Sequence, residues 1–266
     1  MESSEVQRAI RVVQSAAFHL GLHTTAAAVL HNSDRIAVRL LPGDVLVRIA
    51  PHTWEADFQF EVEVACALAE TDCPIGELEP RVEPRAYVRD AFAFTFWKYY
   101  EHTGDVMPTA YADALMRMHA GLRQIRLAAP HITERISAWA EEVNTHEQTP
   151  DLSNSDREML RSTFRDVQNK LSHHRTSDQL LHGEPHPGNL LNTHSGPLFI
   201  DLQTCQYGPI EYDIAFMPEE AAEHYLGANY QLVQLFRTVN WAGFTTMRWR
   251  SSDQFPNRAY WRAEGF

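Results

Sequence analysis

The sequence has 266 residues, of which 44% are hydrophobic and 22% are charged. These are ordinary globular proportions, so a disordered or fibrous protein is excluded, and a chain of this length can bury one large core or two smaller ones. The net charge of −12 opposes binding to a phosphate backbone and argues against a nucleic-acid partner. The same charge could attract a cationic small molecule, although many proteins carry such an excess as a solvated surface.

The sequence gives no sign of a targeting segment or of a disulfide framework. Its first residues, MESSEVQRAIRVVQ, contain no apolar signal-peptide core, and no stretch approaches the roughly 18 uncharged apolar residues of a membrane span. We therefore expect a cytoplasmic protein with no membrane partner. Cys66, Cys73 and Cys205 form no CxxC pair, which indicates reduced thiols rather than disulfides or a zinc knuckle.

Residues 1–96 have the pattern of a small β-rich lobe. Apolar residues recur at helical spacing over 4–21, and three short apolar runs follow at 26–31, 35–41 and 44–50. Turn residues at 32–34 and 42–44 separate these runs, which predicts three antiparallel strands. Residues 54–70 have the pattern of a helix. The pattern of residues 86–100 predicts two strands that are joined through Arg89 and Asp90 and end in a connector.

Residues 97–266 have a mainly helical pattern. The expected helices cover 108–125, 134–146 and 155–174, the last with Ser155 and Glu158 as a capping box. One β-like island interrupts them between 179 and 204, where turn residues at 192–197 predict two short strands. The expected class is α+β, with an antiparallel-sheet domain at 1–96 and a helical domain at 97–266.

The segment LLHGEPHPGNLL carries the densest group of chemically useful side chains. Its glycines and prolines forbid a regular helix, so its polar side chains must lie on a shaped loop: His182, Glu184, His186 and Asn189. Such a loop directly after an apolar strand is typical of functional sites. A zinc site is excluded because the HExxH motif needs helical spacing, which this order of residues does not have.

Asp201 ends the apolar run PLFID twelve residues after Asn189. An amide oxygen and a carboxylate from adjacent loops are the hard oxygen ligands that Mg²⁺ prefers, with water and phosphates at its remaining positions. Each residue taken alone could instead cap a turn or bond to its own backbone, as Asx residues in loops usually do.

Together these segments resemble a known family. HGEPHPGNLL followed by FIDLQTCQYGPIEYDIA is similar to the catalytic and metal-binding loops of the aminoglycoside phosphotransferase and choline kinase-like family, whose pattern is HGDxxxxN, a short hairpin, IDxE or DFG, and a glycine-proline turn. The resemblance implies a bilobal protein-kinase-like fold and transfer of phosphate from ATP with Mg²⁺. It makes Glu184 the catalytic carboxylate, Asn189 and Asp201 the metal ligands, and Asp213 and His182 the structural supports of the loop.

The resemblance extends to the first lobe. Arg48 of LVRIAP stands where the family has a strand lysine that touches the phosphates, and Glu61 of FEVEVACAL stands where a helix glutamate pairs with that cation. No GxGxxG loop is present, so the hairpin that contains Ser33 would cover the phosphates. The connector TFWKYY resembles the hinge that binds adenine, which assigns base binding to Phe96, Trp97 and Lys98. ATP is the expected phosphate donor, with GTP as the alternative.

Two positions depart from the family pattern. Glu184 stands in place of aspartate, and its extra methylene displaces the carboxylate by about 1 Å, a shift that can cost about a hundredfold in rate. Phosphoryl transfer, however, passes through a loose transition state in which positioning matters more than full proton removal. Arg48 keeps the positive charge of lysine but presents it as a planar fork.

The acceptor is open at this stage. We expect a small-molecule hydroxyl, with an antibiotic such as an aminoglycoside or a cationic peptide antibiotic as the first candidate. A metabolite kinase for an amino alcohol, a sugar or a nucleoside is the alternative within the enzyme class. A ligand-binding pseudokinase, inactivated by the changes at Glu184 and Arg48, is the alternative outside it. The sequence fits a monomer and a homodimer equally well.

Overall fold

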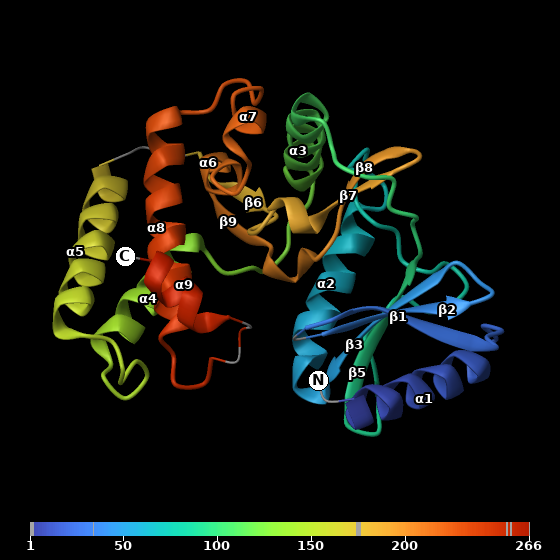
Figure 1. Ribbon diagram of the computed structural model, residues 1–266. Coiled ribbons are helices and arrows are strands. Elements are labelled where there is room, and N and C mark those ends of the chain that lie inside the picture. The colour runs from blue at the N-terminus through green and yellow to red at the C-terminus, as the bar shows by residue number, and fades with distance from the viewer. Residues whose placement is uncertain (1–2, 34, 174–176, 254, 256, 266) are drawn as a thin grey trace. The chain divides into compact units, whose positions relative to one another are not determined.

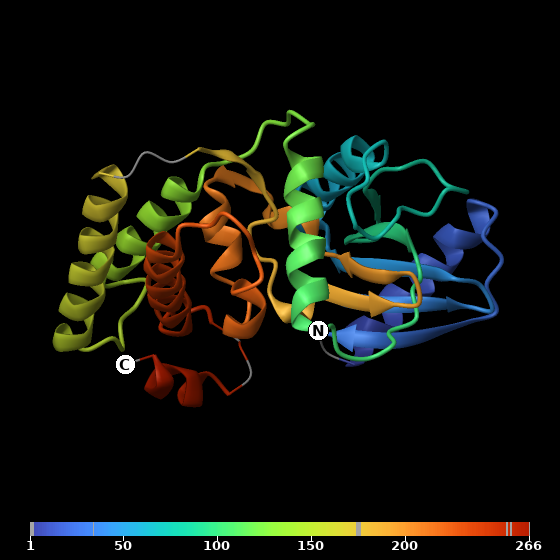
Figure 2. The same cartoon turned by 90° about the horizontal axis from the view of Figure 1, so that it is seen from above.

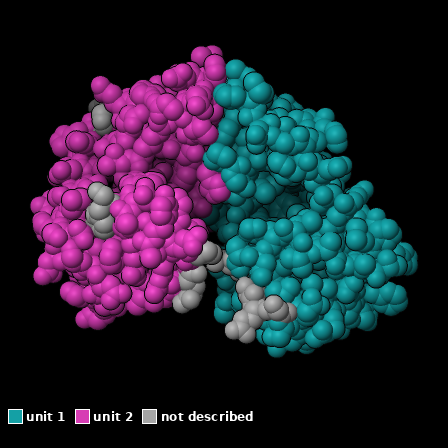
Figure 3. All heavy atoms as spheres, in the orientation of Figure 1, with its two compact units in different colours: residues 1–127, 187–204 teal, residues 128–186, 205–266 magenta. Residues whose placement is uncertain are grey.

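The computed structural model describes residues 3–33, 35–173, 177–253, 255 and 257–265 (Figure 1). Its contacts divide the chain into two compact units, coloured separately in Figure 3. Unit 1 contains residues 1–127 and 187–204, and unit 2 contains residues 128–186 and 205–266. The domain boundary expected between residues 96 and 97 falls inside unit 1, and a functional division at that point stays a prediction.

Unit 1 is built around a five-stranded sheet in which every neighbouring pair is antiparallel. Its strands, in spatial order, are β1 (Ala26–Asn32), β2 (Ile36–Leu41), β3 (Val45–Pro51), β5 (Phe92–Lys98) and β4 (Tyr87–Arg89). The three strands and the later strand pair expected from the apolar runs are thus confirmed. The tight turn between β4 and β5 uses Asp90 and Ala91 at φ of 49° and 70°, a left-handed conformation that suits a two-residue hairpin.

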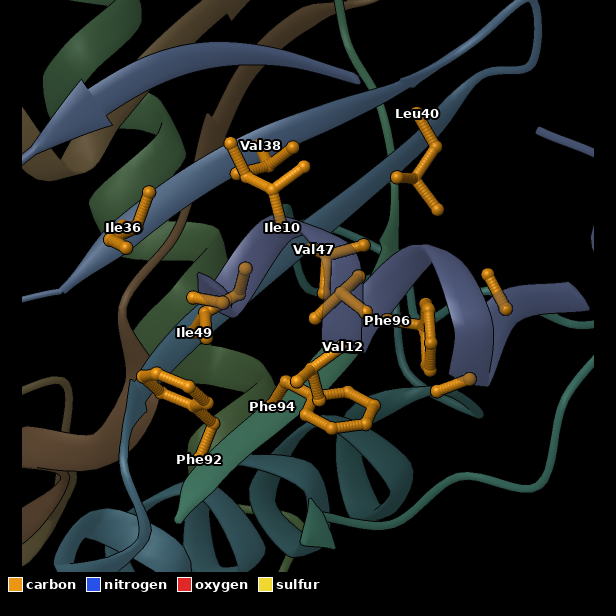
Figure 4. Packing of buried hydrophobic residues seen from close by; sticks show 14 of the residues in the cluster. Ile10, Val12, Ile36, Val38, Leu40, Val47, Ile49, Phe92, Phe94 and Phe96 are labelled. Carbon is orange, nitrogen blue, oxygen red and sulfur yellow. The ribbon is translucent and has the colours of Figure 1, made fainter. Parts of the chain in front are cut away.

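The two faces of this sheet carry different side chains because successive residues of a strand point to opposite sides. Helix α1 (Ser3–His19) covers one face, where large apolar side chains pack together (Figure 4): Ile10, Val12, Ile36, Val38, Leu40, Val47, Ile49, Phe92, Phe94 and Phe96. Ala50 and Ala93 lie on the other face and pack with Phe58 of helix α2 (Glu55–Leu68). Arg48 lies between Val47 and Ile49, so alternation turns its side chain toward the α2 face.

The expected hairpin between Asn189 and Asp201 is also present in unit 1. Strands β7 (Leu190–Thr193) and β8 (Gly196–Phe199) pair antiparallel through a turn at Gly196, whose φ of 107° suits glycine. The hairpin lies beside helix α3 (Pro108–Leu122) in both ribbon views (Figures 1 and 2), with the rings of Tyr111 and Phe199 centred 6.1 Å apart. Pro108 begins α3, where a missing N–H group costs nothing.

Unit 2 is dominated by three helices that pack against one another: α4 (Ile132–Asn144), α5 (Asn154–His173) and α8 (Tyr230–Arg248). Trp139, Phe164 and Phe236 are buried in the core between them. Gly243 is required for this packing, because a Cβ atom there would lie 2.4 Å from the Trp139 ring. Three short helices complete the unit: α6 (Ile210–Ile214), α7 (Glu219–Ala222) and α9 (Arg258–Glu264).

Two details of unit 2 differ from expectation. Strand β6 (Gln179–Leu181) pairs with β9 (Gln206–Gly208), a partner too short to show alternation in the sequence. The prediction of a capping box at Ser155 and Glu158 is wrong, because α5 begins at Asn154. Ser153 caps the helix instead, since its Oγ accepts a hydrogen bond from the Asp156 N–H at 3.2 Å. Within the described ranges, no helix is long and apolar enough to cross a lipid bilayer.

Candidate functional site

The β7–β8 hairpin brings Asn189 and Asp201 to the same end. Pairing of Leu190 with Phe199 continues one residue further, where the Ile200 N–H donates to the Asn189 carbonyl at 3.0 Å. Asp201 comes next and has a φ of 71°, in the left-handed region, so the chain turns sharply at this carboxylate. The hairpin therefore juxtaposes the two expected metal ligands although twelve residues separate them.

Arg48 and Glu61 meet on the α2 face of the sheet. Arg48 Nη1 donates to Glu61 Oε1, and the same oxygen accepts a hydrogen bond from the Leu202 N–H at 3.1 Å. Glu61 is fully buried, and its Oε2 has no hydrogen-bond partner among the residues that the structure describes. Because Leu202 follows Asp201, the glutamate ties helix α2 to the end of the hairpin.

Asp201 accepts hydrogen bonds from two arginines. Arg48 Nη2 lies 2.8 Å from its Oδ1, while Arg35 reaches both oxygens, with Nη1 2.8 Å from Oδ1 and Nη2 3.0 Å from Oδ2. The Arg35 guanidinium also lies over the Trp54 ring, 5.4 Å from its centroid. We call Arg35, Arg48, Glu61 and Asp201 the charge cluster; with every member ionised it has no net charge.

The charge cluster fixes the ionisation of Asp201 and Arg48. Burial alone would raise the pKa of Asp201, but the guanidinium groups of Arg48 and Arg35 outweigh it and lower this pKa to about 2. Burial alone would lower the pKa of Arg48, but Glu61 and Asp201 outweigh it and raise this pKa above its usual value. Asp201 and Arg48 are therefore both charged at neutral pH.

The chemistry of Asn189 and Asp201 fits a hard divalent cation. One amide and one carboxylate supply oxygen ligands and leave other positions to water and phosphate oxygens, as Mg²⁺ prefers. Both Asp201 oxygens already accept guanidinium hydrogen bonds, so a bound cation competes with the arginines for this carboxylate. In the described ranges, no three His, Cys, Asp or Glu side chains gather as a metal site that could compete.

The residues expected in the connector, Phe96, Trp97 and Lys98, are instead the last three residues of β5, and their main chain also contacts the segment 77–79. The Phe96 carbonyl accepts from the Glu79 N–H at 3.1 Å, and the Lys98 N–H donates to the Glu77 carbonyl at 2.9 Å. Phe96 and Trp97 are buried, whereas Lys98 is exposed. These hydrogen bonds hold the end of β5 in place, and base binding by Phe96, Trp97 and Lys98 stays a prediction.

Ser33 lies in the turn between β1 and β2, where its N–H donates to the Arg35 carbonyl at 3.0 Å. Asp34 of the same expected hairpin lies outside the described residues. The turn that carries Ser33 thus also carries Arg35, the residue that reaches Asp201. Contact between Ser33 and a phosphate stays a prediction.

In unit 2, Asp213 supports the loop that carries Glu184. Asp213 is fully buried on α6, and its two oxygens accept hydrogen bonds from the N–H groups of His182 and Gly183, both at 2.9 Å. Gly183 has a φ of 91°, which glycine adopts without strain. The buried His182 ring adds a second support, because its Nδ1 accepts from the Glu184 N–H at 3.3 Å. The loop is therefore held through its main chain.

The side chain of Glu184 has an arginine partner. Arg135 Nη1 from α4 donates to Glu184 Oε1 at 2.9 Å and to the Tyr212 hydroxyl at 3.3 Å. Burial alone would lower the pKa of Arg135, but Tyr212 and Glu184 outweigh it and raise this pKa. The Glu184 side chain is 28% exposed, so it is partly buried beside Arg135.

Arg35 and Arg135 were not expected from the sequence. A signal for Arg35 was present: Ile36, Val38 and Leu40 face α1, so alternation places Arg35 on the same side as Arg48. Arg135 has no comparable local signal, because its contact with Glu184 spans 49 positions of the chain.

The model of the APH phosphotransferase enzyme family matches residues 25–231, from just before β1 to the start of α8. The chain belongs to this family. The match includes the charge cluster, the β7–β8 hairpin and the Glu184 loop, and it confirms the resemblance and the expected enzyme class, a small-molecule phosphotransferase. A search of the curated proteins finds no significant match.

Three similar solved structures agree with this assignment. The amicoumacin kinase hAmiN, in complex with AMP-PNP, Ca²⁺ and Ami, has a TM-score of 0.68 at 13% identity and covers 99% of this chain and 94% of its own. Wild-type aminoglycoside 2′-phosphotransferase-IIIa in its GDP complex has a TM-score of 0.71 at 15% identity, and the match covers 96% of this chain and 94% of that enzyme. A choline/ethanolamine kinase family protein from Mesorhizobium loti has a TM-score of 0.69 at 15% identity, and the match covers 96% of this chain and 92% of that protein. They confirm the expected α+β, protein-kinase-like fold.

Proposed function

We propose that this protein transfers a phosphate from ATP, with Mg²⁺, to a hydroxyl group of a small molecule. The observation that carries the proposal is the contact of Arg48 with both Glu61 and Asp201, at the end of the hairpin that also holds Asn189. A fixed cation close to two candidate oxygen ligands supports the binding of phosphate and metal together. Membership of the phosphotransferase family supports the same activity.

Each member of the site has a distinct proposed role on the nucleotide side. Arg48 contacts the phosphates, and Glu61, buried and bonded to it, fixes the direction of its guanidinium. Asn189 and Asp201 would hold the metal, which when bound neutralises negative charge on the phosphate oxygens. The turn with Ser33 would cover the phosphates, and the end of β5 at 96–98 would contact the base.

Glu184 is the proposed orienting group for the acceptor hydroxyl. The Asp213 contacts fix the main chain on its N-terminal side, and Arg135 fixes one side of its carboxylate. Because the transition state of phosphoryl transfer is loose, such positioning contributes more than complete removal of the proton. The longer glutamate can therefore serve where the family has aspartate.

The proposed acceptor is a cationic small molecule, and an antibiotic is the first candidate. The net charge of −12 favours a cation, and two of the similar structures are named as an amicoumacin kinase and an aminoglycoside phosphotransferase. An amino alcohol is the second candidate, because another similar structure is a choline/ethanolamine kinase family protein. Aminoglycosides and choline are both positively charged, so charge alone does not separate the two candidates.

A transfer assay with an acceptor panel tests the proposal. The wild type, Asp201→Ala and Glu184→Ala would be compared on ATP·Mg²⁺ with aminoglycosides, cationic peptide antibiotics, choline, ethanolamine and sugars. Asp57→Ala, which removes an exposed carboxylate from α2, is the matched control. We expect turnover on one class, unchanged in the control and reduced about 10³-fold in Asp201→Ala, since metal charge neutralisation supplies several kcal/mol.

The same assay distinguishes an enzyme from a binding protein. ATP binding without turnover on any acceptor, together with unaltered ligand binding in Glu184→Ala, would indicate a ligand-binding pseudokinase. Turnover that persists in Asp201→Ala would contradict the metal role of that residue.

A further inference from the structure

Arg35 is a charged residue of the cluster to which the proposed reaction assigns no role. Its guanidinium forms a two-pronged contact with both oxygens of Asp201, at 2.8 and 3.0 Å, across 166 positions of the chain. The two side chains are only 20% and 17% exposed, so the pair is largely shielded from water. A bidentate arginine–carboxylate pair in such a setting is strong and directional. Arg35 therefore competes with a metal for both oxygens of Asp201.

The charges of the cluster make this contact exchangeable. Arg35 and Arg48 together balance Asp201 and Glu61, so a divalent cation arriving alone would place two more positive charges beside two guanidinium groups. A metal that arrives with nucleotide phosphates brings negative charge with it. The planar fork that fits a carboxylate also fits a phosphate, so Arg35 can exchange one partner for the other.

Arg35 is better placed to move than Arg48. Arg48 is anchored on the central strand β3 and donates to the fully buried Glu61 as well as to Asp201. Arg35 precedes β2, in the turn that carries Ser33, and beyond Asp201 its guanidinium lies over the Trp54 ring. The turn is the element proposed to cover the phosphates, so a short movement of the Arg35 side chain carries the charge to them.

We propose that Arg35 is a displaceable partner of Asp201, which releases this carboxylate to the metal and binds the nucleotide phosphates in exchange. This inference rests on the proposed metal and nucleotide roles of Asp201 and Arg48. Its consequence is thermodynamic coupling between the two ligands. A metal ion alone binds weakly, because it displaces Arg35 from Asp201 while no phosphate is present to pair with the arginine. Bound nucleotide supplies that phosphate and so strengthens metal binding. Removal of Arg35 must then affect the two ligands in opposite directions.

The experiment measures Mn²⁺ binding without nucleotide and AMP-PNP binding with and without Mg²⁺. The proteins are the wild type, Arg35→Ala, Arg35→Lys and the control Arg11→Ala, which removes an exposed arginine from α1. For Arg35→Ala we expect Mn²⁺ alone to bind about tenfold more tightly and AMP-PNP·Mg²⁺ about tenfold more weakly, within the range usual for coupled sites. Arg35→Lys should lie between the wild type and Arg35→Ala, and the control should match the wild type.

The outcomes separate this inference from the proposed function. If Arg35→Ala weakens AMP-PNP·Mg²⁺ binding but leaves Mn²⁺ binding unchanged, Arg35 only contacts phosphate and the displacement is wrong. If neither affinity changes, the inference is also wrong, although the proposed function stands. If the wild type binds no nucleotide under any condition, the proposed function fails, and the inference that rests on it fails too. Thermal unfolding of each variant verifies that the fold is intact.

Discussion

Asp201 in the charge cluster of unit 1 and Asp213 beside the Glu184 loop of unit 2 are held by different kinds of partner. In the cluster, Asp201 is held by the ends of two long side chains, Arg35 and Arg48. In the loop, the contacts of Asp213 run to main-chain N–H groups of His182 and Gly183. Side-chain ends can change partners by rotation, whereas main-chain groups cannot move without a change in the fold.

This difference implies that the charge cluster and the Glu184 loop are suited to different functions. A buried ion pair gains little net stability, because desolvation of its charges offsets their attraction, so the cluster can exchange partners when a charged ligand arrives. A buried N–H group that loses its acceptor has no such substitute and costs about 1 to 3 kcal/mol. The cluster is therefore suited to bind and release, and the loop is suited to keep one shape.

The largest effect should come from Asp213→Ala. It leaves two buried N–H groups without acceptors, so the free energy of unfolding should fall by about 3 to 5 kcal/mol. Urea unfolding measures this loss. Asp213→Asn keeps one acceptor oxygen and should lose about half as much. A loss below about 1 kcal/mol in Asp213→Ala would show that the loop does not depend on this carboxylate.

The next effect is a pH dependence that Asp201 gives to the stability of unit 1. Its pKa is about 2 in the folded protein, against an ordinary 3.8, so its contribution is present above pH 4 and is lost as the pH falls toward 2. Asp201→Asn should lower the free energy of unfolding by about 2 kcal/mol at pH 6. Urea titrations from pH 6 to pH 2.5 should show this difference shrinking. A difference independent of pH would contradict the ion pairing.

A smaller effect is expected where Arg135 acts through Glu184. Arg135→Gln should lower kcat about tenfold, or about 1.4 kcal/mol, and leave the KM for ATP within about twofold, because Arg135 positions the acceptor group and not the nucleotide. Tyr212→Phe, which removes the hydroxyl bonded to Arg135, should have a milder effect. The two changes Arg135→Gln and Glu184→Gln should not add. An equal rise in the KM for ATP would assign Arg135 a different role.

The sequence predicted the parts of this site that depend on local pattern. Apolar runs bounded by turn residues located the strands of the sheet and the hairpin between Asn189 and Asp201. The role of Asp213 as a support of the Glu184 loop was predicted only from the resemblance to the phosphotransferase family. Alternation puts Arg35 on the same side of the sheet as Arg48, but its contact with Asp201 spans 166 positions, which no local pattern encodes. Strand β9 was missed because three residues are too few to show a period.

The smallest effect should come from Arg48→Lys, which restores the residue type of the family pattern. Lysine keeps the charge, but its single ammonium cannot reproduce a fork that reaches Glu61 with Nη1 and Asp201 with Nη2. We expect a loss of about 0.5 to 1 kcal/mol in unfolding free energy and at most about a fivefold weaker affinity for AMP-PNP·Mg²⁺. Arg48→Met, the matched neutral variant, should be more damaging than lysine because it removes the cation that offsets the burial of Glu61. If lysine were as damaging as methionine, the geometry of the guanidinium group, and not its charge, would hold the cluster together. Exchange of partners by rotation of Arg35 would then be too costly to operate.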